Sequence, residues 1–196
     1  MESQSGSALV VKSNALISAM VDLSLMGNRF LAFAITLLPR DLDPLSGKPV
    51  ELEVPVLEFA TAFELDPKNA YREIEALADQ LQRKIITLQP DQTLDGSRVK
   101  VGLITRQKYR DGEGRVWIRF DEELVPHLVG LREQFTQYNI KDVYQFGRAS
   151  TWRVYEILKQ YKSAGKREID IEDFKRMTAT VGKYPRPTDL KRFVID

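Results

Sequence analysis

The side chains best suited to chemistry in this sequence are cations near its carboxyl end. Leu190, Phe193 and Val194 are spaced as on one face of a helix over residues 188–196, so the neighbouring cations must point outward. The candidate contacts in this helix and in the turn before it are Lys183, Tyr184, Arg186, Thr188, Lys191 and Arg192. Long cationic side chains at the start of a helix suit phosphate oxygens and base edges. The spacing therefore predicts a DNA recognition helix, with a solvated basic surface as the alternative.

A second group of cations surrounds a predicted helix over residues 70–81 and the hairpin that follows it. The candidates are Lys68, Asn69 and Arg72 around the helix start, and Arg106, Lys108, Arg110 and Arg115 in the hairpin. Glu73, Glu75 and Asp79 lie on the outward face of the same helix, where carboxylates repel phosphate. Only the first helical turn and the hairpin can therefore approach a DNA backbone. We expect this part to position phosphates or to pair subunits, and the C-terminal part to read sequence.

Catalytic and metal-binding patterns are nearly absent from the sequence. It has no Cys and one His, and it lacks the G-x-S-x-G motif and the phosphate-binding G-x-x-x-x-G-K-[ST] motif. His127 follows a proline in an apolar stretch, which favours a structural role. Residues 121–123 are all acidic, and a helix start, where acids complement the helix dipole, is a better interpretation than a metal site. We therefore predict no catalytic residue, no metal, no cofactor and no enzymatic activity.

Length and charge limit the class of protein. The chain has 196 residues and a net charge of +1, but residues 1–80 carry −6 and residues 141–196 carry +5. Such an asymmetry suggests that one end meets an anionic partner. The lack of Cys fits a reducing compartment, and no apolar run approaches the ~20 residues of a membrane span. We expect a cytoplasmic protein without membrane contact.

The order of elements in the first part of the chain is that of a winged helix. Ser24 is placed to cap an almost wholly apolar helix, and VELEV alternates as a half-buried strand. The predicted strands are 8–11, 50–54, 83–88, 98–109 and 115–120, and the predicted helices are 15–20, 25–38, 55–63, 70–81 and one from 121. A core helix, a helix-turn-helix and a hairpin in this order indicate a winged-helix domain.

The second part of the chain repeats this order. VPVLEF at 54–59 matches IDIEDF at 169–174, and a core helix containing an arginine precedes each. The predicted elements are a connection at 135–146, a helix at 150–161, a strand at 166–169, and helices at 170–178 and 188–196. The side chains expected to be buried are Val154, Ile157, Leu158, Tyr161, Ile171, Phe174 and Met177. We therefore predict an α+β fold of two tandem winged-helix domains.

Seven segments, in the right order, resemble plasmid replication initiators of the iteron-binding type, the Rep-3 superfamily. They are VVKSNALI (10–17), AY (70–71), GEGRVWIRF (112–120), LREQFTQY (131–138), VYEILKQY (154–161), GKREI (165–169) and YPRPTDLKRFVID (184–196). The resemblance implies one winged-helix domain at 1–138 for dimerisation and DNA-backbone contact. It implies a second, at 139–196, that reads the major groove of repeated origin sites, called iterons.

The resemblance also implies partners and a mode of action. Monomers of such initiators open double-stranded origin DNA and help to recruit the host replication initiator and the replicative helicase, whereas homodimers repress the initiator's own gene or pair origins. Arg186, Lys191 and Arg192 fall on the recognition segment. Family members continue from this helix into a β-hairpin wing, so the second domain is expected to be incomplete at its C-terminus. A winged-helix transcriptional repressor and a dimerisation-only fragment of an initiator are the alternative functions.

Overall fold

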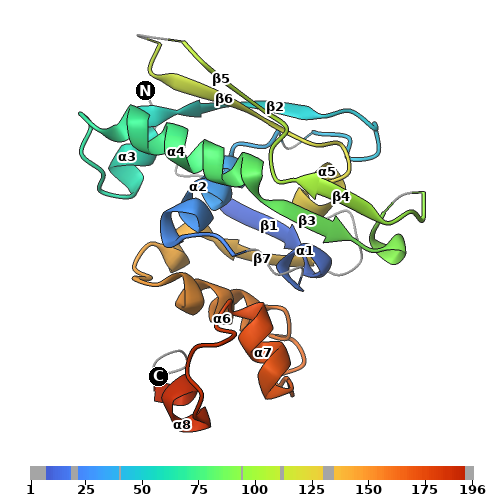
Figure 1. Ribbon diagram of the computed structural model, residues 1–196. Helices are drawn as coiled ribbons and strands as arrows, with labels where there is room; N and C mark the ends of the chain where they lie inside the picture. Colours follow the sequence, from blue (N-terminus) through green and yellow to red (C-terminus); the bar gives the residue numbers. More distant parts are fainter. Residues whose placement is uncertain are drawn as a thin grey trace.

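The computed structural model describes residues 8–18, 22–39, 41–93, 95–110, 113–129 and 135–192. The strands are β1 (Leu9–Ser13), β2 (Val50–Pro55), β3 (Ile85–Leu88), β4 (Val99–Gly102), β5 (Arg106–Tyr109), β6 (Arg115–Phe120) and β7 (Phe135–Asn139). The helices are α1 (Asn14–Ser18), α2 (Leu25–Thr36), α3 (Val56–Ala62), α4 (Ala70–Arg83), α5 (Val125–Leu128), α6 (Ala149–Lys159), α7 (Ile171–Met177) and α8 (Pro187–Leu190), with short 3-10 turns η1 (Pro90–Gln92) and η2 (Ile140–Val143). In Figure 1 the sheet of β2, β6 and β5 lies uppermost, α4 and α2 lie beneath it, and α6, α7 and α8 follow below β1 and β7.

Helix α2 lies at the centre of the core because it is apolar on almost every side. Its N-terminus is capped by Ser24, whose Oγ accepts the Gly27 backbone N–H at 3.0 Å. Phe30 and Phe33 meet Phe59 of α3 edge to face, with ring centroids 5.4 Å apart in both pairs. The apolar core helix expected after Ser24 is confirmed, as are the two helices of the helix-turn-helix, α3 and α4.

The alternating VELEV segment forms an edge strand of a three-stranded antiparallel sheet, in the order β2-β6-β5. Leu52 of β2 lies opposite Ile118 of β6. The single strand expected at 98–109 is wrong, because β4 pairs with β3 and only β5 joins the hairpin. Leu103 and Ile104, each 1% exposed, lie between these two strands. Their burial turns the chain from one sheet to the other, a tertiary effect that the apolar pattern does not reveal.

The segment at 135–146, expected to be a connection, contains a strand. β7 pairs antiparallel with β1, and Lys12 lies opposite Thr136. Exposed and buried residues alternate along β7, and Tyr138 is 3% exposed. The prediction was wrong because the mixed polar and aromatic residues obscured a period of two. The partner strand also lies at the other end of the chain.

Helix α6 forms where expected but buries a different face. Its buried residues are Trp152, Arg153, Glu156 and Ile157, whereas Leu158 and Tyr161 are 61% and 40% exposed. Of the four residues expected to be buried, only Ile157 is, and Val154 is half-buried, so the predicted face was wrong for Leu158 and Tyr161. Two of the buried side chains are charged, and apolar periodicity assigns charged side chains to the outside.

A second apolar core at the C-terminal end is not observed in the described part of the chain. Residues 166–169, expected to be a strand, form none, because no described strand pairs with them. Helix α7 forms as expected, with the Asp170 side chain capping its N-terminus, but none of its residues is buried. Ile171, an expected core residue, is 40% exposed. In α8, Leu190 is buried at 2% exposure.

The expected boundary between residues 138 and 139 falls inside β7. Trp152 of α6 belongs to the same hydrophobic cluster as Val10 and Phe30. Helix α6 therefore packs into the core built by the first part of the chain. The division into domains at 1–138 and 139–196 stays a prediction.

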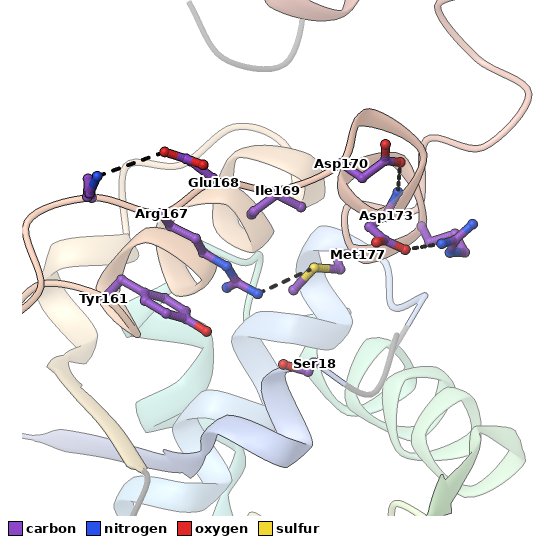
Figure 2. Close-up of a pocket in the computed structure, with 10 residues that line it drawn as sticks. Ser18, Tyr161, Arg167, Glu168, Ile169, Asp170, Asp173 and Met177 are labelled. Atoms are coloured by element: carbon purple, nitrogen blue, oxygen red, sulfur yellow. Dashed lines mark hydrogen bonds and ion pairs between the residues drawn. The ribbon is translucent and has the colours of Figure 1, made fainter.

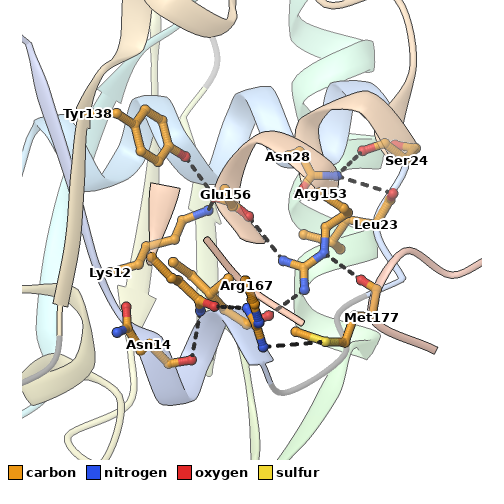
Figure 3. Close-up of polar contacts among 12 residues, drawn as sticks. Lys12, Asn14, Leu23, Ser24, Asn28, Tyr138, Arg153, Glu156, Arg167 and Met177 are labelled. Carbon is orange, nitrogen blue, oxygen red and sulfur yellow. Dashed lines mark hydrogen bonds and ion pairs between the residues drawn. The ribbon is translucent and has the colours of Figure 1, made fainter. Parts of the chain in front are cut away.

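A buried ion-pair network joins α6 to the first strand (Figure 3). Oε1 of Glu156 accepts Lys12 Nζ and the Tyr138 hydroxyl, each at 2.7 Å. Arg153 Nη1 donates to the other oxygen, Oε2, at 3.0 Å. Burial acts to raise the pKa of Glu156, but the charges of Lys12 and Arg153 outweigh it and hold the pKa below its ordinary value of 4.5. The carboxylate is therefore ionised, and both of its oxygens have partners.

The lowered pKa predicts a loss of stability in acid. Since the unfolded chain binds a proton at Glu156 at a higher pH than the folded chain does, the contribution of this group is present above about pH 4.5 and is lost as the pH falls through the folded-state pKa. Urea unfolding at a series of pH values measures the effect. Below pH 4.5 the free energy of unfolding should fall more steeply in the wild type than in Glu156→Gln. Parallel pH curves for the two proteins would contradict the prediction.

Candidate nucleic-acid interface

The predicted recognition segment contains a short helix with exposed cations on either side of it in sequence. Arg186 is the N-cap of α8, Pro187 lies in the first turn, and the Arg186 carbonyl accepts the Leu190 N–H at 3.2 Å. Because Leu190 packs inward, the side chains around it face solvent. The exposed candidates are Lys183, Arg186, Thr188, Lys191 and Arg192. Phe193 and Val194, expected on the inner face, lie outside the described residues.

The turn before α8 and the start of α6 line one hollow. Tyr184 is half-buried and has a φ of 54°, a left-handed conformation that costs a non-glycine residue roughly 1–2 kcal/mol. The Lys183 N–H donates to the Thr180 carbonyl at 2.9 Å. Lys183 and Tyr184 line a hollow of about 220 Å³ with Thr180 and with Ser150 of α6. Sequence reasoning missed Ser150 and Thr180 as neighbours of these cations, and no sequence signal could have found them, because only tertiary packing brings them together.

At the start of α4 the candidate side chains contact one another. Asn69 Oδ1 accepts Arg72 Nη2 at 3.0 Å, and Asn69 Nδ2 donates to Asp66 Oδ2 at 3.2 Å. Asp66 also accepts the Lys68 backbone N–H at 3.0 Å. Lys68 and Arg72 are exposed, and the Asn69 amide that contacts Arg72 is uncharged.

The hairpin arginines share the outer face of the sheet with carboxylates of β2. Arg115 forms an ion pair with Glu53, and Arg106 Nη1 lies 3.8 Å from Glu51 Oε2. The same alternation that predicted β2 places both glutamates on one face of this strand. That these glutamates would face the hairpin arginines could not be predicted, because it depends on the pairing of β2 with β6.

The other two hairpin cations lie against Trp117. Lys108 Nζ is 4.8 Å and Arg110 Cζ is 5.5 Å from the centre of the indole ring. Arg110 Nη1 also lies 3.2 Å from Glu113 Oε1. Three of the four hairpin cations are therefore paired with carboxylates, which reduces the attraction of this surface for phosphate.

Removing the two carboxylates of β2 is expected to strengthen binding to duplex DNA. In Glu51→Gln with Glu53→Gln the hairpin arginines are left without their anionic partners, so the affinity for a mixed-sequence duplex should rise about tenfold at low salt and its salt dependence should steepen. Fluorescence anisotropy at two salt concentrations measures both quantities. Asp41→Asn with Glu122→Gln, which changes the net charge equally at other exposed positions, is the control. Equal gains in the two double variants would contradict a role for the hairpin.

The structure brings the hairpin and the start of α4 together. The Gly114 carbonyl accepts the Val56 N–H at 3.0 Å, and a Cβ on Gly114 would stand 3.7 Å from the Tyr71 hydroxyl. In Figure 1 the start of α4 and the turn end of β5 and β6 lie on the same side of the molecule as α8, which is lower in the view. The candidates therefore form two groups, an upper one on α4 and the hairpin and a lower one around α8.

Another hollow, of about 740 Å³, lies between the end of α6 and α7 (Figure 2). The Arg167 guanidinium stands over the Tyr161 ring, 4.3 Å from its centre. Arg176 on its wall is paired with Asp173 of the same helix. The residues lining this hollow include none of the candidate DNA contacts. It therefore lies apart from the candidate interface.

His127 has a structural role, as expected. It is 1% exposed, its Nδ1 lies 2.7 Å from Ser13 Oγ, and its Nε2 lies 2.8 Å from the Gln92 carbonyl oxygen. A carbonyl can only accept, so Nε2 carries the ring proton and Ser13 donates to Nδ1. Ser13 is also 1% exposed, so this Ser–His pair is closed to a substrate.

The acidic cluster at 121–123 precedes a helix rather than starting it. Helix α5 begins at Val125, and Asp121 Oδ1 accepts the Glu123 N–H at 3.1 Å. Burial raises the pKa of Asp121. Within the described ranges, no group of three or more His, Cys, Asp or Glu residues could hold a metal ion.

Comparison with known proteins decides the family. Residues 9–159 match the family model described as "Initiator Replication protein, WH1". The chain belongs to this initiator family. The match runs from β1 through the last residue of α6. The Rep-3 resemblance seen in the sequence is thereby confirmed.

One solved structure shares the fold of this member of the initiator family. The Pi initiator protein, in a crystal structure with iteron DNA, is 18% identical and superposes with a TM-score of 0.77 over 97% of this chain and 83% of that one. The expected winged-helix fold is thereby confirmed. The WH1 domain of MSBI1.176, a replication protein isolated from a multiple sclerosis patient, is 24% identical, with a TM-score of 0.45 over 65% of this chain and 97% of that one.

A curated relative matches only part of the initiator-family chain. An uncharacterized 27.6 kDa protein of Escherichia coli is 28% identical over 115 residues, which are 58% of this chain and 47% of the relative. The chain thus matches about half the length of that relative. None of the helices in the described residues is both long and apolar enough to cross a membrane.

Proposed function

We propose that this chain binds double-stranded DNA at the iteron repeats of a plasmid replication origin and helps to initiate replication there. The observation that carries the proposal is the superposition of 97% of the chain on an initiator crystallised with iteron DNA. The cationic groups on this chain support it, since the cations around α8 and in the hairpin are exposed or half-buried and the two elements lie on the same side of the view in Figure 1. Neutralising phosphates with such cations releases counterions, which drives binding.

The two cationic groups have different roles in DNA binding. Around α8, exposed arginine and lysine side chains stand at both ends of a short helix, where they can reach base edges in the major groove. On the hairpin, arginines paired with carboxylates suit a small number of phosphate contacts. We therefore assign sequence reading to the α8 group and backbone positioning to the α4 and hairpin group.

The proposal includes a change of oligomeric state. Homodimers form through the first part of the chain, and monomers act at the origin with the host replication initiator and the replicative helicase. Family membership and the sequence resemblance support this part of the proposal.

A binding titration tests the proposed function. Duplexes selected by the chain from a random-sequence pool are titrated beside scrambled duplexes at two salt concentrations, and the oligomeric state is measured alongside. Selectivity of about a thousandfold for direct repeats supports an initiator. Selection of inverted repeats by a dimer would indicate a repressor, and a stable dimer without selectivity would indicate a dimerisation module. Either of the last two results overturns the proposal.

Arg192→Ala is the most direct variant of the reading group. If Arg192 donates to a base, its removal should weaken binding to the selected duplex by about 1–3 kcal/mol and relax the preference at one base pair. Lys162→Ala, at another exposed cation, should change the affinity little. Equal affinity of wild type and Arg192→Ala would remove this side chain from the interface.

A further inference from the structure

Helices α7 and α8 bury few apolar side chains completely, although Phe174 and Met177 of α7 are half-buried. None of the residues of α7, all of which the structure describes, is buried, and the one buried residue of α8 is Leu190. Since burial of apolar surface is the main force that docks one element on another, polar contacts must contribute much of what orients α7 and α8.

Two arginines contact Met177, the last residue of α7 (Figure 3). Arg153 Nε donates to the Met177 carbonyl at 3.1 Å, and Arg167 Nη2 lies 3.8 Å from its sulfur. The other nitrogens of Arg153 donate to the Ile17 carbonyl at the end of α1 and to the Glu156 carboxylate at 3.0 Å. One guanidinium of α6 therefore bridges α1 and α7, and it is 5% exposed.

Arg167 is tied to the N-terminal part of the chain as well. Its Nη1 donates to Gln160 Oε1 at 2.6 Å, and Gln160 Nε2 donates to the Asn14 carbonyl at 3.2 Å. We call the contacts of Arg153 and Arg167 on Met177 the clasp. Both arginines of the clasp are connected to α1, Arg153 directly through the Ile17 carbonyl and Arg167 through Gln160.

Beyond Met177, hydrogen bonds continue toward the DNA-facing cations. Thr178 Oγ1 and Thr180 Oγ1 are 2.9 Å apart, and the two residues are 2% and 3% exposed. The Thr180 N–H donates to the Lys175 carbonyl at 2.8 Å, and the Thr180 carbonyl accepts the Lys183 N–H at 2.9 Å. A hydrogen-bonded turn thus connects Met177 to Lys183 and α8, so a shift of Met177 would also move the residues around α8.

We propose that Arg153 is a positioning residue for DNA binding: through the clasp it fixes α7 and α8 relative to the N-terminal part, so that both cationic groups meet one duplex. The inference rests on the proposed function. When both cationic groups belong to one rigid body, binding of the first group to DNA places the second at a high effective concentration beside it. If the second group is loosely held, its effective concentration is lower and the affinity of the whole chain for DNA falls. Arginine is required because its planar fork donates in three directions, and lysine carries a point charge on one nitrogen.

The test compares amide hydrogen exchange with duplex affinity in the full chain. Arg153→Lys keeps the positive charge beside Glu156 but removes the planar guanidinium that donates to Met177, Glu156 and Ile17. A second variant, Lys12→Met with Arg153→Met and Glu156→Gln, replaces the buried charges by groups of similar size, which buried networks often tolerate. In both, exchange in residues 171–192 should quicken about tenfold or more while residues 50–63 keep their protection, and affinity for a mixed-sequence duplex should fall about tenfold.

Arg176→Lys is the matched control, because Arg176 lies on α7 at 59% exposure and pairs with Asp173 of the same helix. It should alter neither measurement. Unchanged exchange at 171–192 in both test variants would overturn the clasp, and faster exchange with unchanged affinity would overturn its role in DNA binding. If the wild-type chain binds no duplex, the proposed function is overturned. The hydrogen-exchange rates of the variants still show in that case whether the clasp orients α7. If Arg153→Lys fails to fold, the triple variant decides alone.

Discussion

Glu156→Ala is expected to lower the free energy of unfolding by about 3–5 kcal/mol. The substitution leaves Lys12 and Arg153, which are 4% and 5% exposed, as buried cations without the anion that they share. The Tyr138 hydroxyl, which donates to the same carboxylate at 2.7 Å, is also left without its acceptor. An unpaired buried charge keeps its full desolvation cost, so the destabilisation exceeds that of an ordinary missing hydrogen bond. Urea unfolding followed by circular dichroism at neutral pH measures it.

Glu168→Ala is the control for this prediction. Its carboxylate is 92% exposed and lies 3.9 Å from Lys166 Nζ, an arrangement that contributes little in water. The control should change the free energy of unfolding by no more than about 0.5 kcal/mol. If Glu156→Ala lowers the free energy of unfolding by less than about 1 kcal/mol, water must reach the network. That result would contradict the burial on which the prediction depends.

Arg186→Ala with Lys191→Ala is expected to lower the affinity for the selected duplex on the order of 100-fold at physiological salt. Both side chains are exposed at the start and end of α8, where each can neutralise a phosphate or reach a base. The slope of log affinity against log salt falls by about one unit for each phosphate that a protein no longer neutralises, so in this double variant it should fall by about 2. A titration at several salt concentrations gives both numbers.

Lys48→Ala with Lys141→Ala is the matched control, since it removes the same charge from exposed positions that belong to neither cationic group. It should leave the salt slope within about half a unit of the wild type, because few counterions are released away from the interface. Equal decreases in the two double variants would mean that net charge alone governs binding, and α8 would then not be the reading element.

Local patterns predicted much of the first part of the chain. The Ser24 cap and the apolar run after it define α2, and the VELEV alternation defines β2. Both follow from residues close together in sequence, where helix and strand periods are set by backbone geometry. The family resemblance likewise came from short segments in order, and the family match confirms it.

Predictions that depended on a distant partner were wrong. The strand expected at 98–109 divides because its halves pair with different strands, and 135–146 contains a strand because β1 pairs with it. The buried face of α6 was misplaced because Arg153 and Glu156 are buried through contacts with Lys12 and Ile17, from the opposite end of the chain. A strand or a buried charge exists only with its partner, and a partner is not a local property.

The candidate interface divides in the same way. The sequence by itself determined which positions carry cations. It also determined, from the spacing of apolar residues, which helices lie beside those positions, and the family to which the chain belongs. The tertiary structure alone decided that Glu51 and Glu53 offset the hairpin arginines and that the start of α4 lies beside the hairpin. It also decided that Arg153, which in sequence is one more cation of a core helix, reaches both α1 and α7. The physical reason is that charge compensation and burial depend on the atoms within a few ångströms, and folding brings those atoms from segments far apart in the chain.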